Sequence, residues 1–320
     1  DIDGEAANDG SGVSVSLNST GDRVAIGAIF NDVPASDAGH VRIYEYSSGS
    51  WSQLGSDIDG EARDDYSGGS VSLNSAGDRV AIGARVNDGT AANSGHVRIY
   101  DTINTYVPDD NFEQALIDLG YDDTLDDYVL TANISGVTSL NVSNEGISDM
   151  TGIEDFTALT ELWCSYNQLT TLDVGSNTAL TDFRCDHNGI TSLDVSSNTA
   201  LTYLNCGTNE LTSLDVSNNS DLTYLGCDDN QLTSLNVTVN TVLTDFSIGW
   251  NPLTGLDLSS NTALTHLEVQ EAQLTSLDVS NNTALDYLDC YNNQLTTLDV
   301  SSNTALTYLS CKSNSLTSLN

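Results

Sequence analysis

Apolar positions recur with a fixed 21-residue period through the C-terminal half of the chain. One leucine column returns at every step: Leu159, Leu180, Leu201, Leu222, Leu243, Leu264, Leu285 and Leu306. A fixed period of this length is typical of a solenoid, in which each coil buries its apolar side against its neighbours. We therefore predict eight stacked coils, separated by roughly 4.8 Å, the spacing of paired strands.

Each coil reads L-x-x-L-x-C-x-x-N-x-L-T-x-L-D-V-x-x-N-T-A, which is the leucine-rich-repeat pattern written twice per turn. An asparagine column begins at Asn167, Asn188, Asn209 and Asn230. We expect these side chains to point inward and bind the backbone at a turn, because buried amides and carbonyls need partners.

A different repeat occupies residues 1–104. The segment 1–28 returns at 57–84, and GHVRIY at 39–44 returns at 95–100, which defines a 56-residue repeat. The stretches SVSL, RVAIGA and GHVRIY, with SWSQLG in the first copy, alternate or are β-branched and predict short strands. Four strands per unit is typical of one propeller blade, and propellers close with about four to eight blades. We predict about two four-stranded, propeller-like β repeats here. Either the remaining blades lie upstream, or this copy pairs differently.

Residues 105–123 predict one short amphipathic helix. Asp110 and Glu113 have the spacing of a capping box, and Gly120 ends the run. Phe112, Leu116 and Leu119 are expected to line its apolar face.

Two resemblances follow from these motifs. PDDNFEQALIDLGYDD followed by TGIEDFTALTELWCSYNQLT resembles the helical cap and first repeats of internalin-type bacterial surface proteins, and covers residues 105–320. GA-x-x-ND…GHVRIY resembles the FG-GAP-like blades of integrin-α-type propellers. The combination also resembles large repeat proteins that gliding Gram-negative bacteria export. The resemblances imply a mostly β protein, secreted or on the outer surface of a bacterium, with blades at 1–104, a helical cap at 105–150 and a repeat array at 151–320. Asp1 and Asn320 fall within repeats, so we expect a piece of a longer protein.

The charge of the chain excludes several functions. With 46 acidic residues against 8 basic ones, the net charge is −38, which repels phosphate backbones and anionic lipids. No stretch approaches the roughly 18 apolar residues of a membrane span. We therefore expect neither nucleic-acid binding nor membrane insertion.

Six cysteines follow the 21-residue period, at Cys164, Cys185, Cys206, Cys227, Cys290 and Cys311. Ile248 and Val269 fill the two remaining places in the column. A column that accepts Cys, Ile and Val interchangeably favours buried thiols over disulfides, and a straight column does not supply a tetrahedral zinc site.

Variable columns are where binding residues are expected. The positions that start at Glu161, Trp163, Ser165 and Tyr166 change from coil to coil, and the first two flank inward columns, so strand alternation directs them outward. They hold the predicted ligand-binding residues: Trp163, Tyr166, Arg184, His187, Tyr203, Tyr224, Trp250, His266, Tyr287, Tyr291 and Tyr308. Exposed tyrosine and tryptophan favour recognition. The alternative is that stacked tyrosines merely stabilise the strand ladder.

An aspartate column at Asp173 and its equivalents is expected to be a solvated stripe bonded to Ser and Thr rather than a row of calcium ligands. The two DIDGE segments, with Asp1, Asp3 and Glu5 in the first and the calcium candidates Asp57, Asp59 and Glu61 in the second, resemble short calcium loops without the full spacing. Ca²⁺ is therefore the one cofactor left open. His40 and His96 share one repeat position and are expected to be structural, and no nucleophile motif or phosphate loop indicates an enzyme.

We therefore predict a non-enzymatic, adhesin-like protein that recognises a protein or glycan through its aromatic face. The alternative is a structural spacer or filament subunit that associates end to end through open strand edges. Ice binding through the Thr170 column is a third, remote possibility, because no second outward threonine column accompanies it.

Overall fold

The computed structural model describes residues 2–47, 49–54, 57–88, 91–102 and 104–320. The chain divides into two compact units: one comprises Asp1–Thr105 with Leu130–Ala132, and the other comprises Tyr106–Val129 with Asn133–Asn320. Asp1, which opens the first DIDGE segment, lies outside the described residues.

The first 56-residue repeat folds into an antiparallel sheet in the order β1-β2-β3-β4, and a short strand, β5, pairs with β3. These strands are β1 (Ser11–Leu17), β2 (Arg23–Ala28), β3 (His40–Ser47), β4 (Ser50–Gln53) and β5 (Ile58–Asp59). The expected four-strand meander is therefore present in this copy.

The second repeat is smaller than predicted. Its sheet contains three described strands, β6 (Ser70–Leu73), β7 (Arg79–Ala84) and β8 (His96–Asp101). The next strand, β9 (Asn104–Tyr106), instead pairs with β10 (Tyr128–Leu130). The described sheet of this copy therefore has three strands, where a four-stranded repeat was predicted.

The two sheets share a core, but equivalent residues in them differ in burial. Ile43 on β3 is 3% exposed because it packs with residues of the second sheet, including Ile82. Its equivalent on β8, Ile99, is 71% exposed. Between the sheets, the Ser14 hydroxyl donates to the Gly68 carbonyl at 2.6 Å. The face of the first sheet that contains Ile43 thus packs against the second sheet, whereas the equivalent face of the second sheet, at Ile99 on β8, is exposed to solvent.

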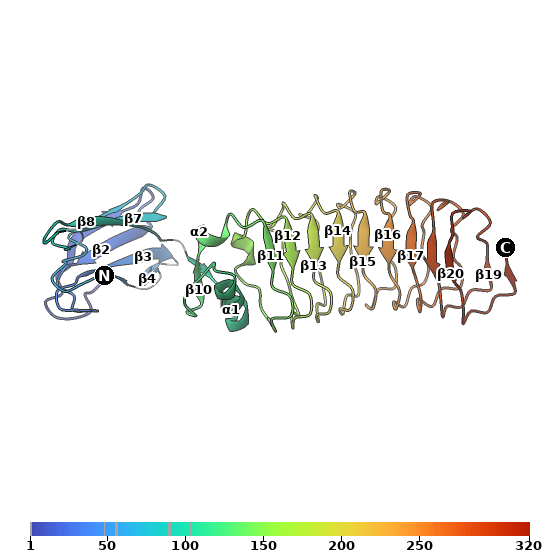
Figure 1. Ribbon diagram of the computed structural model, residues 1–320, viewed down its shortest axis with the longest axis horizontal. Coiled ribbons are helices and arrows are strands. Elements are labelled where there is room, and N and C mark those ends of the chain that lie inside the picture. Colours follow the sequence, from blue (N-terminus) through green and yellow to red (C-terminus); the bar gives the residue numbers. More distant parts are fainter. Residues whose placement is uncertain (1, 48, 55–56, 89–90, 103) are drawn as a thin grey trace. The chain divides into compact units, whose positions relative to one another are not determined.

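The second unit is a solenoid whose coils each add one strand to a nine-stranded parallel sheet (Figure 1). The strands are β11 (Ser139–Asn141), β12 (Glu161–Trp163), β13 (Asp182–Arg184), β14 (Tyr203–Asn205), β15 (Tyr224–Gly226), β16 (Asp245–Ser247), β17 (His266–Glu268), β18 (Tyr287–Asp289) and β20 (Tyr308–Ser310). From β12 on, the register advances by one 21-residue period per strand, so that Leu162 pairs with Phe183. A second, two-stranded parallel sheet joins β19 (Thr297–Leu298) to β21 (Ser318–Leu319).

The cysteine column lies inside this solenoid, as predicted. All six thiols are free, five are buried and Cys311 is half-buried. Burial raises the pKa of Cys206 and of Cys290 to about 12, so at neutral pH these side chains are protonated, apolar core groups.

Two asparagine ladders join successive coils. In the predicted one, the Asn188 amide donates to the carbonyls of Cys164 and Cys185, both at 3.1 Å, and its oxygen accepts from the Leu169 amide. The other ladder was not predicted, and it is completely buried in most coils. There Asn219 donates to the Val195 carbonyl at 3.1 Å and to the Asn198 carbonyl at 2.9 Å.

The cap begins with α1 (Asp110–Asp118), and its N-cap is Asp109, not Asp110 as predicted. Glu113 is buried and accepts from the amides of Asp126 and Tyr128, so it is not part of a capping box. Phe112 is buried in the solenoid core as expected, whereas Leu119 is 47% exposed, contrary to prediction.

The remaining cap elements are α2 (Thr131–Ile134) and the 3₁₀ turn η1 (Ile153–Asp155). Residues of the cap and of the coils belong to one continuous core. No helix in the described part of the chain has the length and apolar character needed to cross a membrane.

Replacing Asn219 by alanine should lower the free energy of unfolding by roughly 2–5 kcal/mol, because two buried carbonyls lose their donor. Asn218→Ala is the matched control: this neighbour is exposed, and its loss should cost less than about 1 kcal/mol. Urea denaturation followed by circular dichroism would measure both; equal effects would contradict the ladder's role.

Replacing Ile43 by alanine should destabilise the first unit by about 2–5 kcal/mol, because it opens a cavity between the sheets. The equivalent change, Ile99→Ala, should stay within about 0.5 kcal/mol, since that side chain is in solvent. Hydrogen exchange of the β2 and β7 amides reports the difference, and a large effect at Ile99 would show that its face is covered in solution.

Candidate binding face

The nine-stranded sheet presents two outward columns along its whole length. In each strand from β12 to β18 the central residue is buried, while the first residue is half-buried in every one. This alternation follows from the pleat, and it places the Glu161 and Trp163 columns on one surface, as predicted. We call this surface the sheet face.

Four predicted binding residues form one continuous stack on the first coils. The Arg184 guanidinium lies over the Trp163 ring at 4.7 Å and over the Tyr203 ring at 4.5 Å. Tyr203 and Tyr224 are stacked with ring centroids 4.1 Å apart. Asp182 fixes the cation through two hydrogen bonds, of 2.9 and 2.7 Å. The stack therefore combines aromatic faces with a preoriented positive charge.

Gly226 lies beside this stack, where there is little room for a side chain. A Cβ atom there would lie 2.7 Å from the Asn205 amide oxygen and 3.0 Å from the Tyr224 hydroxyl. A side chain would therefore displace the phenol of Tyr224. Burial and the neighbouring Tyr203 raise the pKa of Tyr224, so this phenol stays neutral.

A second stack lies on the later coils. His266 and Tyr287 have ring centroids 4.1 Å apart, and Tyr287 and Tyr308 have centroids 4.3 Å apart, all nearly parallel. Burial and the adjacent Tyr308 raise the pKa of Tyr287 to about 12. Tyr308, at the end of the stack, is 44% exposed.

The Tyr166 column follows the strands and adopts left-handed backbone conformations. Tyr166 and His187 have φ of 60° and 56°, and their rings stack with centroids 4.0 Å apart. Trp250 belongs to the same column and is 45% exposed. Tyr291, from the neighbouring column, is 36% exposed. Within the described residues, Trp250 and Tyr291 stack on no other ring, so the predicted set forms three groups and two single residues.

The Ser165 column varies in sequence as freely as the Tyr166 column, but most of its members are buried. Ser165, Asp186 and Gln270 are 8%, 9% and 7% exposed, since the chain turns inward after each strand. The Ser165 hydroxyl donates to Asp186 at 2.6 Å. Only the last members, including Tyr291, reach the surface.

Acidic groups separate the two aromatic stacks. Glu268 lies on β17 beside His266, and it accepts a hydrogen bond from Ser247 at 3.2 Å. Asp245 stands between Tyr224 and His266 in the same column. The sheet face thus alternates aromatic and negatively charged segments.

The aspartate column accepts backbone hydrogen bonds within its own turn. Asp194 Oδ1 accepts from the Ser196 amide at 2.9 Å, and Asn236, which replaces aspartate in one coil, accepts from Thr238 in the same way. These bonds agree with the predicted solvated stripe. The hydroxyl and amide of Ser196 lower the pKa of Asp194 below its ordinary 3.8.

The three calcium candidates do not form one cluster. Asp57 lies beside His40, with Asp57 Oδ2 3.3 Å from His40 Nδ1. Glu61 instead lies 3.6 Å from His96, and the Asp59 oxygen Oδ1 is buried without a hydrogen-bond partner in the described part of the chain. Burial raises the pKa of Asp59. His40 was expected to be structural. In the sequence, this histidine and the DIDGE segment recur together with the same 56-residue offset, and this shared recurrence could have indicated that they belong to one site.

Comparison with known proteins identifies the repeat type. No protein-family model matches the chain. Over 76 residues, 24% of the chain, it is 44% identical to Internalin J of Listeria monocytogenes serotype 4b (strain F2365), and this segment is 8% of that protein. The solved functional domain of InlJ from Listeria monocytogenes, described as including a cysteine ladder, is 39% identical over 68% of the chain, with a TM-score of 0.57.

The array is an internalin-like leucine-rich-repeat solenoid. Internalin C2 of Listeria monocytogenes has the same fold, with a TM-score of 0.56, 22% identity and coverage of 67% of this chain and 95% of its own. The chain spans 54% of the InlJ domain and less than a tenth of full-length Internalin J. The similarity therefore concerns the solenoid, and none of these matches shows the propeller-like interpretation of residues 1–104.

Replacing the five aspartates of the column whose pKa is lowered with asparagine should make the solenoid less sensitive to acid. They are Asp194, Asp215, Asp257, Asp278 and Asp299. A carboxyl group whose pKa is lower in the folded than in the unfolded chain stabilises the fold at pH above the unfolded pKa, which is near 3.8. This stabilisation is lost as the pH falls through the folded-state pKa. Asparagine keeps the turn, as Asn236 does, without that titration.

The measurement is the urea midpoint of wild type and variant at pH 7, 4 and 2.5. Between pH 4 and 2.5 the wild type should lose more stability than the variant. Asp22 and Asp109, whose pKa values are also lowered, are unchanged in both chains and serve as the common background. Parallel pH curves would contradict this prediction.

Proposed function

We propose that the chain is a non-enzymatic, adhesin-like binding protein that recognises a partner protein through the sheet face. The proposal is supported by one observation above all: aromatic and charged side chains are concentrated on the outward columns of the sheet, while the core, asparagine and aspartate columns repeat almost unchanged. Stacked rings provide large contact area and lose little rotamer freedom on binding.

The pattern of charge favours a partner with positively charged side chains. Asp245 stands between the two aromatic stacks, Glu268 lies beside His266 of the second stack, and the whole chain carries a net charge of −38. Lysine and arginine of a partner would meet both carboxylates and ring faces. A glycan ligand, which stacked tyrosines could also hold, is the other outcome that a binding screen can return.

The location proposed is the bacterial cell surface or the secreted fraction. It is supported by the similarity to Internalin J, whose solved functional domain also contains a cysteine ladder. We further propose that residues 1–104 are part of an FG-GAP-type propeller. The open apolar face at Val97 and Ile99, which is buried at the equivalent Val41 and Ile43, supports stacking of a further sheet.

Replacing Tyr203, Tyr224, Tyr287 and Tyr308 with serine should weaken partner binding by at least about tenfold, since hot-spot aromatics each contribute roughly 1–2 kcal/mol or more. The probes are purified extracellular proteins and glycans arrayed on a surface, screened with wild type, and the dissociation constants of the hits are then measured for the variant.

The matched control replaces Tyr106 and Tyr128 with serine. These two rings also contact each other, at 5.4 Å, and are 49% and 41% exposed, but they lie outside the sheet face. Their loss should leave binding unchanged. A purely structural role for the face predicts instead no specific hit, or hits that bind both variants equally well.

A further inference from the structure

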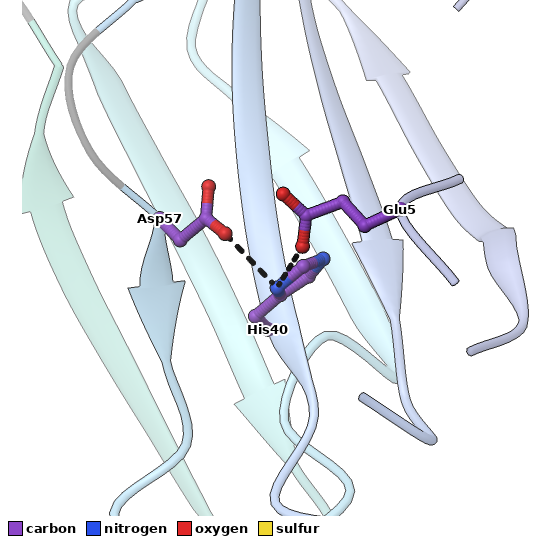
Figure 2. Close-up of side chains that lie close together, drawn as sticks. All are labelled: Glu5, His40 and Asp57. Carbon is purple, nitrogen blue, oxygen red and sulfur yellow. Dashed lines mark ion pairs between the residues drawn. The ribbon is translucent and has the colours of Figure 1, made fainter. Parts of the chain in front are cut away.

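Three ligating side chains meet at the junction of the two N-terminal repeats. Glu5 precedes β1, His40 begins β3, and Asp57 precedes β5 (Figure 2). His40 Nδ1 lies 3.3 Å from Asp57 Oδ2 and 3.9 Å from Glu5 Oε2. One ligand atom from each residue lies within 4.8 Å of the other two, and the described residues contain no other group of three or more His, Cys, Asp or Glu with this geometry.

The histidine is buried, and one of its ring nitrogens lacks a hydrogen-bond partner. His40 is 1% exposed, and its Nδ1 makes no hydrogen bond to any described residue. A buried polar nitrogen without a partner destabilises the fold unless a ligand satisfies it. Figure 2 shows this nitrogen pointing between the two carboxylates, which is the place an ion would fill.

Each carboxylate has one oxygen held by a donor and the other directed at His40. Gln53 Nε2 donates to Asp57 Oδ1 at 2.7 Å, and Arg42 Nη1 lies 3.5 Å from Glu5 Oε1. Asp57 Oδ2 and Glu5 Oε2 remain on the histidine side. Partners of this kind orient the ligands of metal sites.

We propose that Glu5, His40 and Asp57 bind one divalent transition-metal ion of the zinc class. An imidazole nitrogen with two carboxylate oxygens suits zinc, whereas calcium takes only oxygen ligands. Ligand atoms about 2.0–2.1 Å from a tetrahedral zinc ion lie roughly 3.3 Å from one another. The 3.3 Å pair already has this spacing, and Glu5, whose side chain is 44% exposed, has room to close the 3.9 Å one.

The second repeat has the same histidine without the third ligand. His96 Nδ1 lies 3.6 Å from Glu61 Oε2, but that oxygen also accepts from Asn87 at 3.1 Å. When the repeat is continued beyond the second copy, the position equivalent to Asp57 is Glu113, which accepts the amides of Asp126 and Tyr128 in the cap. The ion would therefore bind only where Asp57 of the second repeat lies beside Glu5 and His40 of the first repeat, and it would join the two repeats.

The test is titration of the metal-free full chain with Zn²⁺ by calorimetry in 150 mM salt, with Co²⁺ absorption as an independent readout of tetrahedral coordination. Wild type should show one saturable site above the weak surface binding of an acidic protein. His40→Gln and Asp57→Asn should remove it, and Gln53→Ala should weaken it about 10–100-fold. His96→Gln is the matched control and should keep it.

Several results would overturn the proposal: no saturable site in wild type, equal loss in His40→Gln and His96→Gln, or binding of Ca²⁺ in preference to Zn²⁺. If His40→Gln fails to fold by circular dichroism, Asp57→Asn decides. That side chain is at the surface of the cluster, 27% exposed, so its loss of binding can be separated from loss of structure.

Discussion

The solenoid depends on one interaction, the pair of hydrogen bonds that a buried asparagine amide donates to backbone carbonyls. Asn219 bonds two carbonyls of the preceding coil, and Asn188 bonds one in the preceding coil and one in its own. Each 21-residue coil contains only a three-residue strand in the long sheet, so most of its backbone is irregular yet lies against a core. Irregular buried backbone needs side-chain partners, because it cannot complete a sheet ladder. The asparagine columns supply them at two corners of most coils, with Ala272 interrupting the first column, and Asn188 and Asn219 are representative members.

This constraint explains why sequence variation is confined to so few positions. Leucine, valine and cysteine fill the interior, asparagine fixes the corners, and aspartate closes the turn that follows. A thiol is tolerated in the core because it is small and, when buried, remains protonated. The outward columns of the sheet face and the Tyr166 column that follows them are free of these demands, and most of the array's tryptophan, arginine, histidine and tyrosine occur there.

The N-terminal unit obeys a different rule. Its repeats are held by packing of one sheet on the next, as the contrast between Ile43 and Ile99 shows. The Glu5–His40–Asp57 cluster lies at the same junction, where one repeat supplies two side chains and the following repeat supplies the third. In both units, the candidate sites combine side chains from consecutive repeats: the cluster uses two N-terminal repeats, and the ring stacks use successive coils.

The periodicity of the sequence by itself determined the coil length, the inward cysteines, the first asparagine ladder and the outward aromatic columns, because a strict repeat gives every coil the same environment. Boundaries where the repeat breaks required the tertiary structure. The pairing of residues 104–106 with the cap, the capping role of Asp109 and the exposure of Leu119 depend on neighbours that have no fixed sequence offset. The same reason applies to His40 and Asp57. Their separation in the sequence matches neither a helical nor a strand period, so only the folded chain shows that they lie together. There the buried imidazole nitrogen of His40 faces two carboxylates.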